Sequence, residues 1–328
     1  MAAFYTSNSQ GISDTELAKW VGISRQEALD SIKTLCALGY IVEAHPQWGY
    51  RLLETPDALM ADDLHARLHG GKSFPPGKIG GQILVFEQMA STQDMVQRLA
   101  RAGYSEGLVV FAEAQSAGRG RMGREWFSPL RKGLWFTVLL RPPCLMQSVQ
   151  RLTVMTAVAV ASSLRRITGL PLRIKWPNDI LCNGRKVIGI LTELSANGPH
   201  LQHATIGIGI NVNLEVPDFP PWLQASATSL KQEAGQSFHR PSLAIEVLRE
   251  LDRCQFLLSD ENFPMLLECW MELDDTLGRQ ISISWNHGRS LRGLASDLDF
   301  DGALLVRTDE GRLERVTAGD VTLEKEIL

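Results

Sequence analysis

The sequence has 328 residues, of which 44% are hydrophobic and 21% are charged, and its formal net charge at pH 7 is −4. This composition excludes a disordered or fibrous chain, and the length allows two or three domains. The negative net charge argues against a protein that coats nucleic acid by bulk electrostatics. The first residues lack the features of a secretory signal, and no apolar run reaches the roughly 18 residues of a membrane span, so we expect a cytoplasmic protein.

The cysteines and histidines do not have the spacing of a metal site. The cysteines are scattered without CxxC spacing and are predicted to be reduced thiols. They are Cys36, Cys144, Cys182, Cys254 and Cys269. His200 and His203 stand three residues apart and would form a metal pair with a third ligand, but none is near in the sequence. We interpret them as two loop histidines and expect no metal site in the protein.

Residues 13 to 52 form the first predicted unit, which has two helices followed by a hairpin. Ser13 with Glu16, and Ser24 with Glu27, have the spacing of capping boxes. In a capping box the hydroxyl and the carboxylate satisfy backbone N–H groups at the start of a helix. We therefore expect one helix to begin after each serine.

The second predicted helix has apolar residues at helical spacing. They are Leu29, Ile32, Leu35 and Leu38. Gly39 is expected to end this helix, and short strands are predicted at 40–43 and 50–53. The order helix, turn, helix and wing is that of a winged helix-turn-helix, although a small helical module used only for packing between domains has the same order.

Contacts of such a unit with DNA would come from polar side chains of the second helix. The candidates are Arg25, Gln26, Lys33 and Thr34. Residues 1 to 55, however, carry four basic side chains against six acidic ones, a net charge of −2. A winged helix binds DNA largely through lysine and arginine contacts with phosphates, so this charge balance predicts weak or lost DNA binding.

The segment from about 80 to 275 alternates predicted strands and helices. Strands are expected at 83–86, 108–112 and 134–140, in the hairpin 180–191 that turns at Asn183 and Gly184, and at 204–214. Helices are expected from the cap residue Ser91 to Gly103, over 152–164, within 243–258 and over 263–273. The connections are too irregular for repeated βαβ units, which predicts an α+β domain with a mixed or antiparallel sheet. Glycine alternates with isoleucine in the strand 204–214, a pattern typical of a strand that another group approaches closely.

The last predicted unit, from about 276 to 328, has four short strands. They are expected at 280–285, 290–295, 303–307 and 312–316. Turn residues separate them at Asn286-His287-Gly288, Asp301-Gly302 and Glu310-Gly311. This spacing fits a small β-barrel of SH3-like size.

The segment GRGRMGREWFSP, at 118–129, places three arginines among glycines. Glycines let a backbone approach a ligand closely, and the forked donors of arginine suit phosphate oxygens. A solvated basic loop or a nucleic-acid patch has a similar composition. Because the run occurs once and leads into an apolar stretch at 134–140, we interpret it as a loop inside a folded domain.

Four other short motifs accompany this loop. They are Ser91-Thr92-Gln93, Gln115, Lys175-Trp176-Pro177-Asn178-Asp179 and Gly207-Ile208-Gly209-Ile210-Asn211. Together the motifs resemble biotin protein ligases, and the order of the three units resembles the bifunctional form that also represses the biotin operon. The resemblance covers essentially the whole chain. It implies a winged helix-turn-helix at 1–62, a mixed-sheet catalytic domain of the biotin/lipoate ligase type at 63–275 and an SH3-like β-barrel at 276–328.

The activity of the family is implied by the same resemblance. ATP and biotin, with Mg²⁺, give biotinyl-5′-AMP and pyrophosphate, and the biotinyl group then passes to a lysine on the biotin carboxyl carrier domain of a carboxylase. A homodimer and operator DNA are further implied partners. Two alternatives stay open: a related ligase for lipoate or another acyl acid, and a ligand-sensing DNA-binding repressor without ligase activity.

Activation of biotin brings its carboxylate against the α-phosphate of ATP, and two anions in contact need fixed cations between them. Lys175 and Arg121 are the catalytic candidates for this role. By the resemblance, the biotin site comprises Ser91, Thr92, Gln93, Gln115, Arg119, Gly120, Arg121 and Lys175. The adenylate and ATP site comprises Arg119, Arg121, Arg124, Trp126, Lys175, Asn178, Lys186 and Asn211. Gln93 stands where the family usually has asparagine, which leaves its contact with the biotin ring open, and Asp179 is a candidate acceptor for the proton of the incoming lysine.

An acyl adenylate is a mixed anhydride that water destroys. We therefore expect residues 116–128 to form a mobile lid with glycine hinges, which closes over biotin and its activated phosphate.

Overall fold

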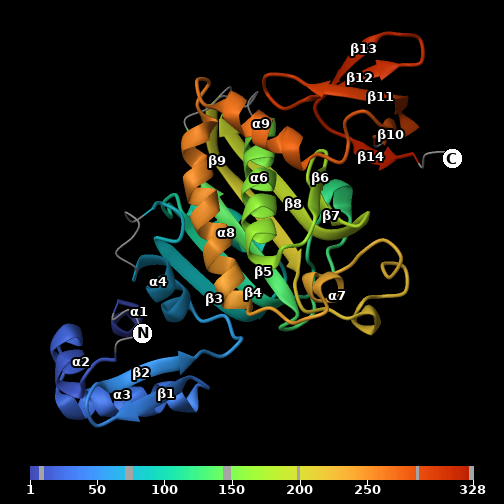
Figure 1. The fold of residues 1–328 in the computed structure, drawn as a ribbon. Coiled ribbons are helices and arrows are strands. Elements are labelled where there is room, and N and C mark those ends of the chain that lie inside the picture. The colour runs from blue at the N-terminus through green and yellow to red at the C-terminus, as the bar shows by residue number, and fades with distance from the viewer. Residues whose placement is uncertain (7–10, 71–76, 143–148, 198–199, 286–287, 325–328) are drawn as a thin grey trace.

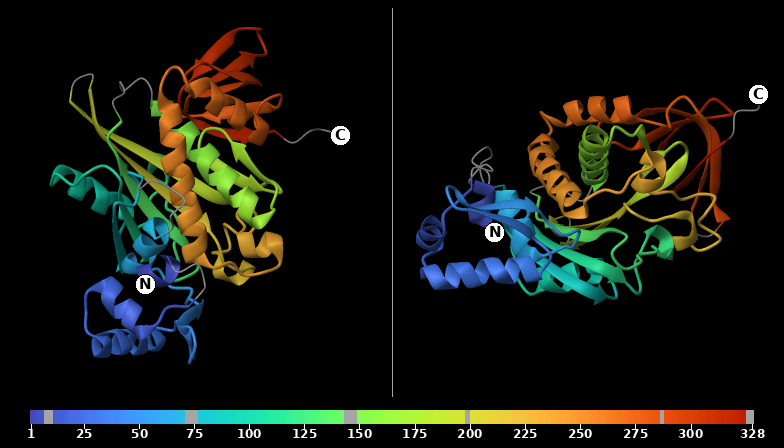
Figure 2. Two further views of the ribbon diagram at one scale, coloured as in Figure 1. Left: turned by 60° about the vertical axis from the view of Figure 1, so that its left-hand side comes forward. Right: turned by 60° about the horizontal axis from the view of Figure 1, so that its bottom comes forward.

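The structure, a computed structural model, describes residues 1–6, 11–70, 77–142, 149–197, 200–285 and 288–324. Within these ranges the chain builds a two-stranded sheet near the N-terminus, a seven-stranded central sheet and a five-stranded C-terminal sheet. The first and last of these lie at opposite ends of the molecule (Figure 1). Two further views show the same arrangement (Figure 2).

The N-terminal part contains three helices and one hairpin. The elements are α1 (Ala2–Thr6), α2 (Asp14–Val21), α3 (Arg25–Ala37), β1 (Ile41–His45) and β2 (Gly49–Glu54). Both predicted capping boxes are confirmed, since the side chains of Ser13 and Ser24 accept from the backbone N–H groups of Glu16 and Glu27 and the glutamates bond back. The short helix α1, which we did not predict, adds Phe4 to the core beside α2 and α3.

The predicted apolar face of α3 needs one correction. Ala28 and Ile32 are the buried residues of this helix, whereas Leu38 is 53% exposed. The reason is that α3 ends at Ala37, so Leu38 has left the helical register that its spacing assumed.

A further unpredicted helix, α4 (Ala61–His69), connects the N-terminal part to the central sheet. The predicted boundary between residues 62 and 63 falls inside this helix. The segment between β2 and α4, which contains Asp57, is held by the buried guanidinium of Arg240. This guanidinium forms ion pairs with Asp57 and Glu113. Glu113 also accepts a hydrogen bond from the backbone N–H of Leu59 at 2.9 Å. Two charges of this cluster are almost fully buried, and each has charged or hydrogen-bonding partners that offset the loss of water.

The central sheet is mixed, as predicted. Its strand order is β3 (Gln82–Met89), β4 (Leu108–Gln115), β5 (Gly133–Leu140), β9 (His200–Asn211), β8 (Arg185–Asn197), β7 (Asp179–Cys182) and β6 (Leu172–Lys175). The pair β3–β4 is parallel, and the other neighbouring strands pair antiparallel. The predicted hairpin turn at Asn183 and Gly184 joins β7 to β8, and both residues have positive φ.

Helices cover the two faces of the sheet differently. On one face lie α6 (Val149–Thr168), α8 (Arg240–Gln255) and α9 (Phe263–Leu273), which match predicted helices (Figure 1). The opposite face carries α5 (Thr92–Arg101), whose Val96 and Ala100 form a separate small core with β4. The short helix α7 (Leu230–Ala234) was not predicted.

The strand β9 explains the alternation of glycine and isoleucine. Ile206, Ile208 and Ile210 belong to the main core, so the intervening Gly207 and Gly209 face the opposite side of the sheet. The interpretation of His200 and His203 as loop residues is wrong, because both lie in β9.

The C-terminal sheet has the strands β10 (Gln280–Ser284), β11 (Ser290–Leu298), β12 (Leu304–Thr308), β13 (Leu313–Val316) and β14 (Asp320–Leu323), in the order β13-β12-β11-β10-β14. Four of these were predicted, and β14 was missed. The sheet is joined to the centre by the buried Trp176, whose indole N–H donates to the carbonyl of Gly302 at 3.1 Å. The predicted turn at Asn286 and His287 lies outside the described residues.

In the described part of the chain, no helix combines the length and the apolar character needed to cross a membrane. Four of the five cysteines are described, and each is free: Cys182 and Cys254 are buried, whereas Cys36 and Cys269 are exposed. Cys144 lies outside the described residues.

Candidate functional site

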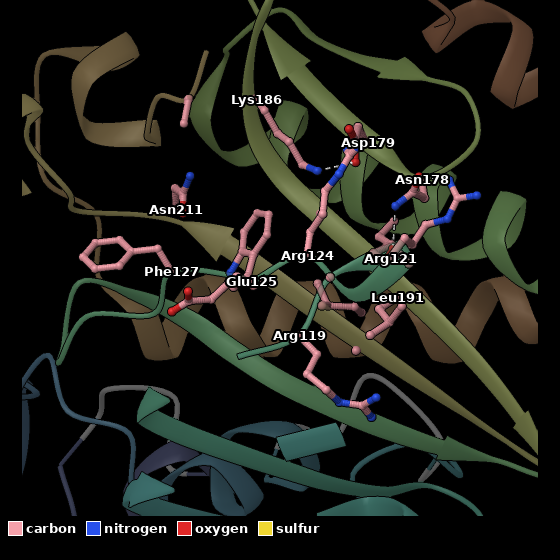
Figure 3. A pocket seen from close by; sticks show the side chains of 18 of the residues that line it. Arg119, Arg121, Arg124, Glu125, Phe127, Asn178, Asp179, Lys186, Leu191 and Asn211 are labelled. Carbon is pink, nitrogen blue, oxygen red and sulfur yellow. Dashed lines mark hydrogen bonds and ion pairs between the residues drawn. The ribbon is translucent and has the colours of Figure 1, made fainter. Parts of the chain in front are cut away.

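A cavity of about 640 Å³ lies on the α5 side of the central sheet. Its walls come from the start of α5, the arginine loop at 116–129, the β6–β7 turn, the strands β8 and β9, the segment 219–227 and β14. Each side chain that the sequence assigned to biotin, adenylate or ATP lines this cavity. Figure 3 draws the side chains of 18 of its lining residues and labels ten of them.

The floor of the cavity is made of glycine on β8 and β9. A Cβ atom at Gly209 would lie 2.3 Å from Nε1 of Trp126, and one at Gly189 would lie 2.6 Å from the ring of the same tryptophan. A Cβ at Gly207 would lie 2.8 Å from Oε1 of Gln93. The groups that approach the strand, expected from its glycines, are therefore the side chains of Trp126 and Gln93. Trp126 carries a buried indole N–H without a hydrogen-bond partner.

Ser91 occupies the cap position of α5, but its side chain does not cap the helix. The backbone N–H of Thr92 donates instead to Oε1 of Gln115 at 2.9 Å. The hydroxyl of Ser91 is buried and has no hydrogen-bond partner among the residues that the structure describes. Burying an unpaired hydroxyl costs about 1 to 3 kcal/mol, so this group is poised to bond with a ligand. Ser91 is thus the cap residue by position, as predicted, but the expected side-chain cap is absent.

Gln93 uses both ends of its amide within the protein. Its Nε2 donates to Oγ1 of Thr205 at 2.9 Å and to the carbonyl of Thr205 at 3.1 Å. Its Oε1 accepts from Oγ1 of Thr137 at 3.2 Å. The extra methylene of glutamine thus carries the amide into contact with the sheet, where only a glycine at position 207 leaves room for it.

The arginine loop is folded as a narrow hairpin. The backbone N–H of Gly120 donates to the carbonyl of Arg124 at 2.7 Å, and that of Trp126 donates to Gly118 at 2.8 Å. Met122 at its tip has φ of 56° and Gly123 has φ of 75°, which makes the turn tight.

Arg119 is bound by carboxylates at the edge of the cavity. Its guanidinium forms a forked pair with Glu193 at 2.9 and 2.8 Å and contacts Asp94 at 2.8 Å. Figure 3 shows this side chain pointing away from the place where Lys186 and Asp179 meet. Arg119 therefore fastens the loop to β8 and α5 in this structure.

Arg121 is half buried and faces the cavity. Its Nη1 donates to Oδ1 of Asn178 at 2.7 Å, and Nδ2 of Asn178 donates to the carbonyl of Ile190 at 2.8 Å (Figure 3). Burial lowers the pKa of Arg121, and the nearby carboxylates of Asp179 and Asp320 raise it in part. A guanidinium stays charged throughout the physiological range, so it is a partly desolvated cation that a phosphate would stabilise.

Arg124 reaches the C-terminal sheet, where it forms an ion pair with Asp320 at the start of β14. Burial alone would raise the pKa of Asp320, but the hydrogen bond and charge of Arg124, with Lys175 and Arg121 nearby, hold that pKa below its usual value. The C-terminal sheet thus supplies one wall of the cavity and an anion among its cations.

Two lysines complete the positive wall. Lys186 lies 2.6 Å from Asp179 and places its ammonium 5.3 Å from the ring centre of Trp126. Lys175, at the end of β6, lines the cavity without an ion pair or hydrogen bond to its ammonium within the described ranges. The carboxylate of Asp179, the candidate proton acceptor, is thus paired with a cation.

Several residues of the cavity and of the wall behind it were missed by the sequence reasoning. Thr137 and Ser128 carry hydrogen bonds inside the cavity wall, the segment 219–227 covers one side, and Asp320 comes from an unpredicted strand. Asn211, which was predicted, donates to the carbonyl of Thr228 at 3.0 Å. Nothing in the local pattern of 219–227 or of β14 indicates a ligand site.

The four candidate DNA-binding residues lie in the N-terminal part, away from the cavity, and their side chains are already engaged. Arg25 pairs with Asp14 at 2.7 Å, and Lys33 pairs with Asp30 at 2.9 Å. Gln26 also donates to Asp30 at 3.3 Å, and Oγ1 of Thr34 donates to the carbonyl of Asp30 at 2.9 Å. Acidic neighbours thus offset both cations on this face.

Comparison with family models matches residues 85–211 to the biotin/lipoate A/B protein ligase family and residues 276–323 to the biotin protein ligase C-terminal domain. Among curated proteins, the bifunctional ligase/repressor BirA of Bacillus subtilis is 34% identical over 98% of this chain and 96% of its own length. The protein of the same name from Escherichia coli is 30% identical over 97% of this chain and 94% of its own length. Among solved structures, the biotin protein ligase from Aquifex aeolicus in complex with biotin and ATP has a TM-score of 0.64 and 27% identity, and covers 75% of this chain and 100% of its own.

Proposed function

This chain belongs to the biotin protein ligase family, and from that premise we propose that it activates biotin with ATP to biotinyl-5′-AMP and transfers biotin to a lysine of a carboxylase carrier domain. The observation that carries the proposal is the cavity itself. Cations from three separate segments line it, together with a glycine floor and a serine hydroxyl that is unpaired among the described residues. Such a cavity suits a ligand that has a neutral hydrogen-bonding head at one end and a phosphate at the other.

The head of biotin is a planar ureido ring that needs a few fixed donors and acceptors. We assign Ser91, Thr92 and Gln115 to this ring, because the hydroxyl of Ser91 is open and Thr92 and Gln115 hold each other in place. Gln93 supports the same end of the cavity through Thr205 and Thr137. Both ends of its amide already bond to the protein. We therefore assign Gln93 a packing contact with the ring.

In the activation step an oxygen of the biotin carboxylate attacks the α-phosphorus of ATP, the bond to the β-phosphate breaks and pyrophosphate leaves. We assign Arg121, Lys175 and Lys186 to the negative charge gathered there, since all three line the cavity and Arg121 and Lys186 are held by Asn178 and Asp179. Fixed cations stabilise developing charge without the reorganisation that water would need.

The nucleotide is assigned to the side of the cavity where Trp126 lies. Its indole rests on Gly189 and Gly209 and offers a flat apolar surface to the adenine base. Arg124, Asn178 and Asn211 complete this side. Arg119 and Gly120 we assign to the biotin carboxylate through the loop backbone, because the guanidinium of Arg119 is bound by Glu193 and Asp94.

Magnesium fits this site only as part of the nucleotide. Within the described residues no group of three histidine, cysteine, aspartate or glutamate side chains could hold a metal ion. Asp179 and Asp320 line the cavity singly and are paired with Lys186 and Arg124. We infer that Mg²⁺ is bound by the phosphates of ATP and neutralises part of their charge, as is usual for this ion.

In the transfer step the lysine amine of the carrier domain attacks the acyl carbon of the adenylate, the bond from that carbon to AMP breaks and the amine loses a proton. The arginine loop, fixed by Arg119 and Arg124, would shield the mixed anhydride until the carrier arrives, which is the role that we propose for residues 116–128 as a lid.

We further propose the division of the chain into a winged helix-turn-helix at 1–62, a catalytic domain at 63–275 and an SH3-like domain at 276–328. A homodimer through the central sheet and a cytoplasmic location are part of the same proposal. The relatives named bifunctional ligase/repressor support a role in transcription, but the paired cations of Arg25 and Lys33 favour weak binding of operator DNA.

The decisive experiment incubates the full chain with ATP, Mg²⁺, biotin and a carrier domain, and detects biotin on the carrier with a streptavidin blot. A carrier whose acceptor lysine is replaced by arginine is the control for site-specific transfer. Labelling of the intact carrier alone is the expected result. Absence of labelling, with biotin still bound, would instead support a ligand sensor without ligase activity.

The matched family model also includes lipoate ligases, so the acid must be identified directly. Calorimetric titration with biotin and with lipoate separates the two. We expect binding of biotin, because lipoate lacks the ureido donors that would satisfy the unpaired hydroxyl of Ser91. Tighter binding of lipoate would assign the chain to the other branch of the family.

A further inference from the structure

A continuous chain of hydrogen bonds runs through the wall of the cavity from the sheet to the arginine loop. In order, its members are Thr205, Gln93, Thr137, Thr92, Gln115, Ser128 and Trp126, and the backbone N–H of Thr92 makes the link to Gln115. The first members surround the proposed ring site, and the last carries the indole assigned to adenine. Ser128 is the link between the two ends.

Ser128 is buried, and both its side chain and its backbone meet Gln115. Its Oγ accepts from Nε2 of Gln115 at 2.9 Å and donates to the carbonyl of Trp126 at 3.1 Å. Its own carbonyl accepts from the backbone N–H of Gln115 at 3.2 Å. These contacts of Ser128 with Gln115 and Trp126 form a junction against which Gly118 packs. Only glycine fits at position 118, because a Cβ there would lie 2.9 Å from Oγ of Ser128 and 2.4 Å from the carbonyl of Trp126.

The protons at this junction can be assigned from its partners. A serine hydroxyl has one proton, and Ser128 gives it to the carbonyl of Trp126, so towards Gln115 it can only accept. The amide of Gln115 must therefore point its Nε2 to Ser128 and its Oε1 to Thr92, whose backbone N–H donates to it at 2.9 Å. A reversed amide would set donor against donor at Thr92 and leave Ser128 without a donor. Thr92 and Ser128 together thus fix which way the amide of Gln115 points.

The other end of the junction fixes Trp126. Its carbonyl is held by Ser128, and its N–H donates to the carbonyl of Gly118 at 2.8 Å. With both backbone groups fixed, the indole lies on Gly189 and Gly209 and meets Trp135 edge-on, with ring centres 6.4 Å apart. Loss of the Ser128 hydroxyl would release one of these two backbone bonds.

We propose that Ser128 is a positioning residue for biotin activation, which ties recognition of the ring at Gln115 to the placement of Trp126 over the nucleotide. This inference rests on the proposed ligase function. When the ring of biotin bonds to Gln115, it holds the base of the arginine loop in place through Ser128. The indole of Trp126 is then already positioned for the adenine base when ATP binds.

The test measures biotin-dependent exchange of pyrophosphate into ATP for the full chain and for Ser128→Ala. We expect the KM for biotin to rise roughly tenfold, which corresponds to about 1.4 kcal/mol at 25 °C, and the KM for ATP to rise as well. Ser128→Cys, with a thiol that is a weak donor and acceptor, is expected to lie between the two and provides a second variant if the alanine protein folds poorly. Ser296→Ala is the matched control, because Ser296 also donates to the carbonyl two residues before it, at 3.2 Å, but lies in the C-terminal sheet away from the cavity.

A double-mutant cycle with Gln115→Ala separates positioning from general stability. If Ser128 acts through Gln115, Ser128→Ala adds little to the KM for biotin once Gln115 is alanine. Fully additive effects, or an unchanged KM in Ser128→Ala, would overturn the inference while the ligase function stands. Absence of biotin-dependent exchange in the unaltered protein would overturn the proposed function itself.

Discussion

Arg121→Ala is expected to slow formation of biotinyl-5′-AMP about a hundredfold. The guanidinium of Arg121 is half buried, is aimed by a 2.7 Å bond to Asn178 and has no carboxylate in direct contact among the described residues. Removing one fixed charge-assisted contact from a site where charge develops costs about 3 kcal/mol, which is roughly a hundredfold in rate. The residue therefore offers its charge to the ligand and contributes little to the fold.

The orientation of the Arg121 guanidinium can be tested separately from its charge. Asn178→Ala leaves the guanidinium present but removes the oxygen that orients it, together with a bond to the carbonyl of Ile190. We expect a smaller loss, roughly tenfold, because the cation can still reach the phosphate at the cost of ordering a free side chain.

The assay is biotin-dependent exchange of pyrophosphate into ATP, with the circular dichroism of each variant as a check on folding. Arg166→Ala is the control. Arg166 lies on α6 and forms ion pairs at the surface with Glu246 and Glu250 of α8, and such pairs contribute little to stability. Near-normal exchange in Arg121→Ala would refute the charge reasoning, and a larger loss in Asn178→Ala than in Arg121→Ala would refute the division of roles.

Four further predictions follow from the site and the N-terminal part. Lys175→Ala should lower pyrophosphate exchange about a hundredfold, because its ammonium lines the cavity without an ion pair or hydrogen bond among the described residues and so offers its charge to the ligand; a normal rate would remove it from the site. Trypsin cleavage within residues 116–128 should slow when biotin and ATP are both present, and equal cleavage with and without them would argue against a lid. Gly209→Ala should weaken ATP binding in calorimetry more than biotin binding, since the new Cβ would lie 2.3 Å from Trp126; the opposite order would misplace the nucleotide. In a mobility-shift assay with its own biotin-gene promoter, the protein should bind weakly at moderate salt, and a specific nanomolar complex would show the charge argument to be wrong.

The contacts of Arg119 and Arg124 bear on how the loop opens. Each arginine forms an ion pair at the cavity wall, with Glu193 and Asp94 in one case and with Asp320 in the other. These pairs are partly exposed, so each stabilises the closed loop only modestly. The loop can thus be ordered in this structure and still open at low cost.

Part of this protein follows from its sequence alone. The capping boxes of Ser13 and Ser24 specify the two N-terminal helices because they satisfy backbone groups within four residues of each serine. The alternation of glycine with isoleucine on β9 specifies one buried face and one open face, because side chains in a strand alternate between the two sides. Such features depend only on neighbours along the chain.

The tertiary structure decides how the site residues are used. Ser91 keeps an unpaired hydroxyl because Gln115, from a neighbouring strand, takes the backbone N–H that the serine was expected to cap. Arg119 is bound by Glu193, 74 residues away, and Arg124 by Asp320, 196 residues away. The sequence identifies which side chains carry the chemistry, but a polar group bonds to whichever partner the fold brings within about 3 Å, and that distance is set only when strands and helices far apart in the chain have packed together.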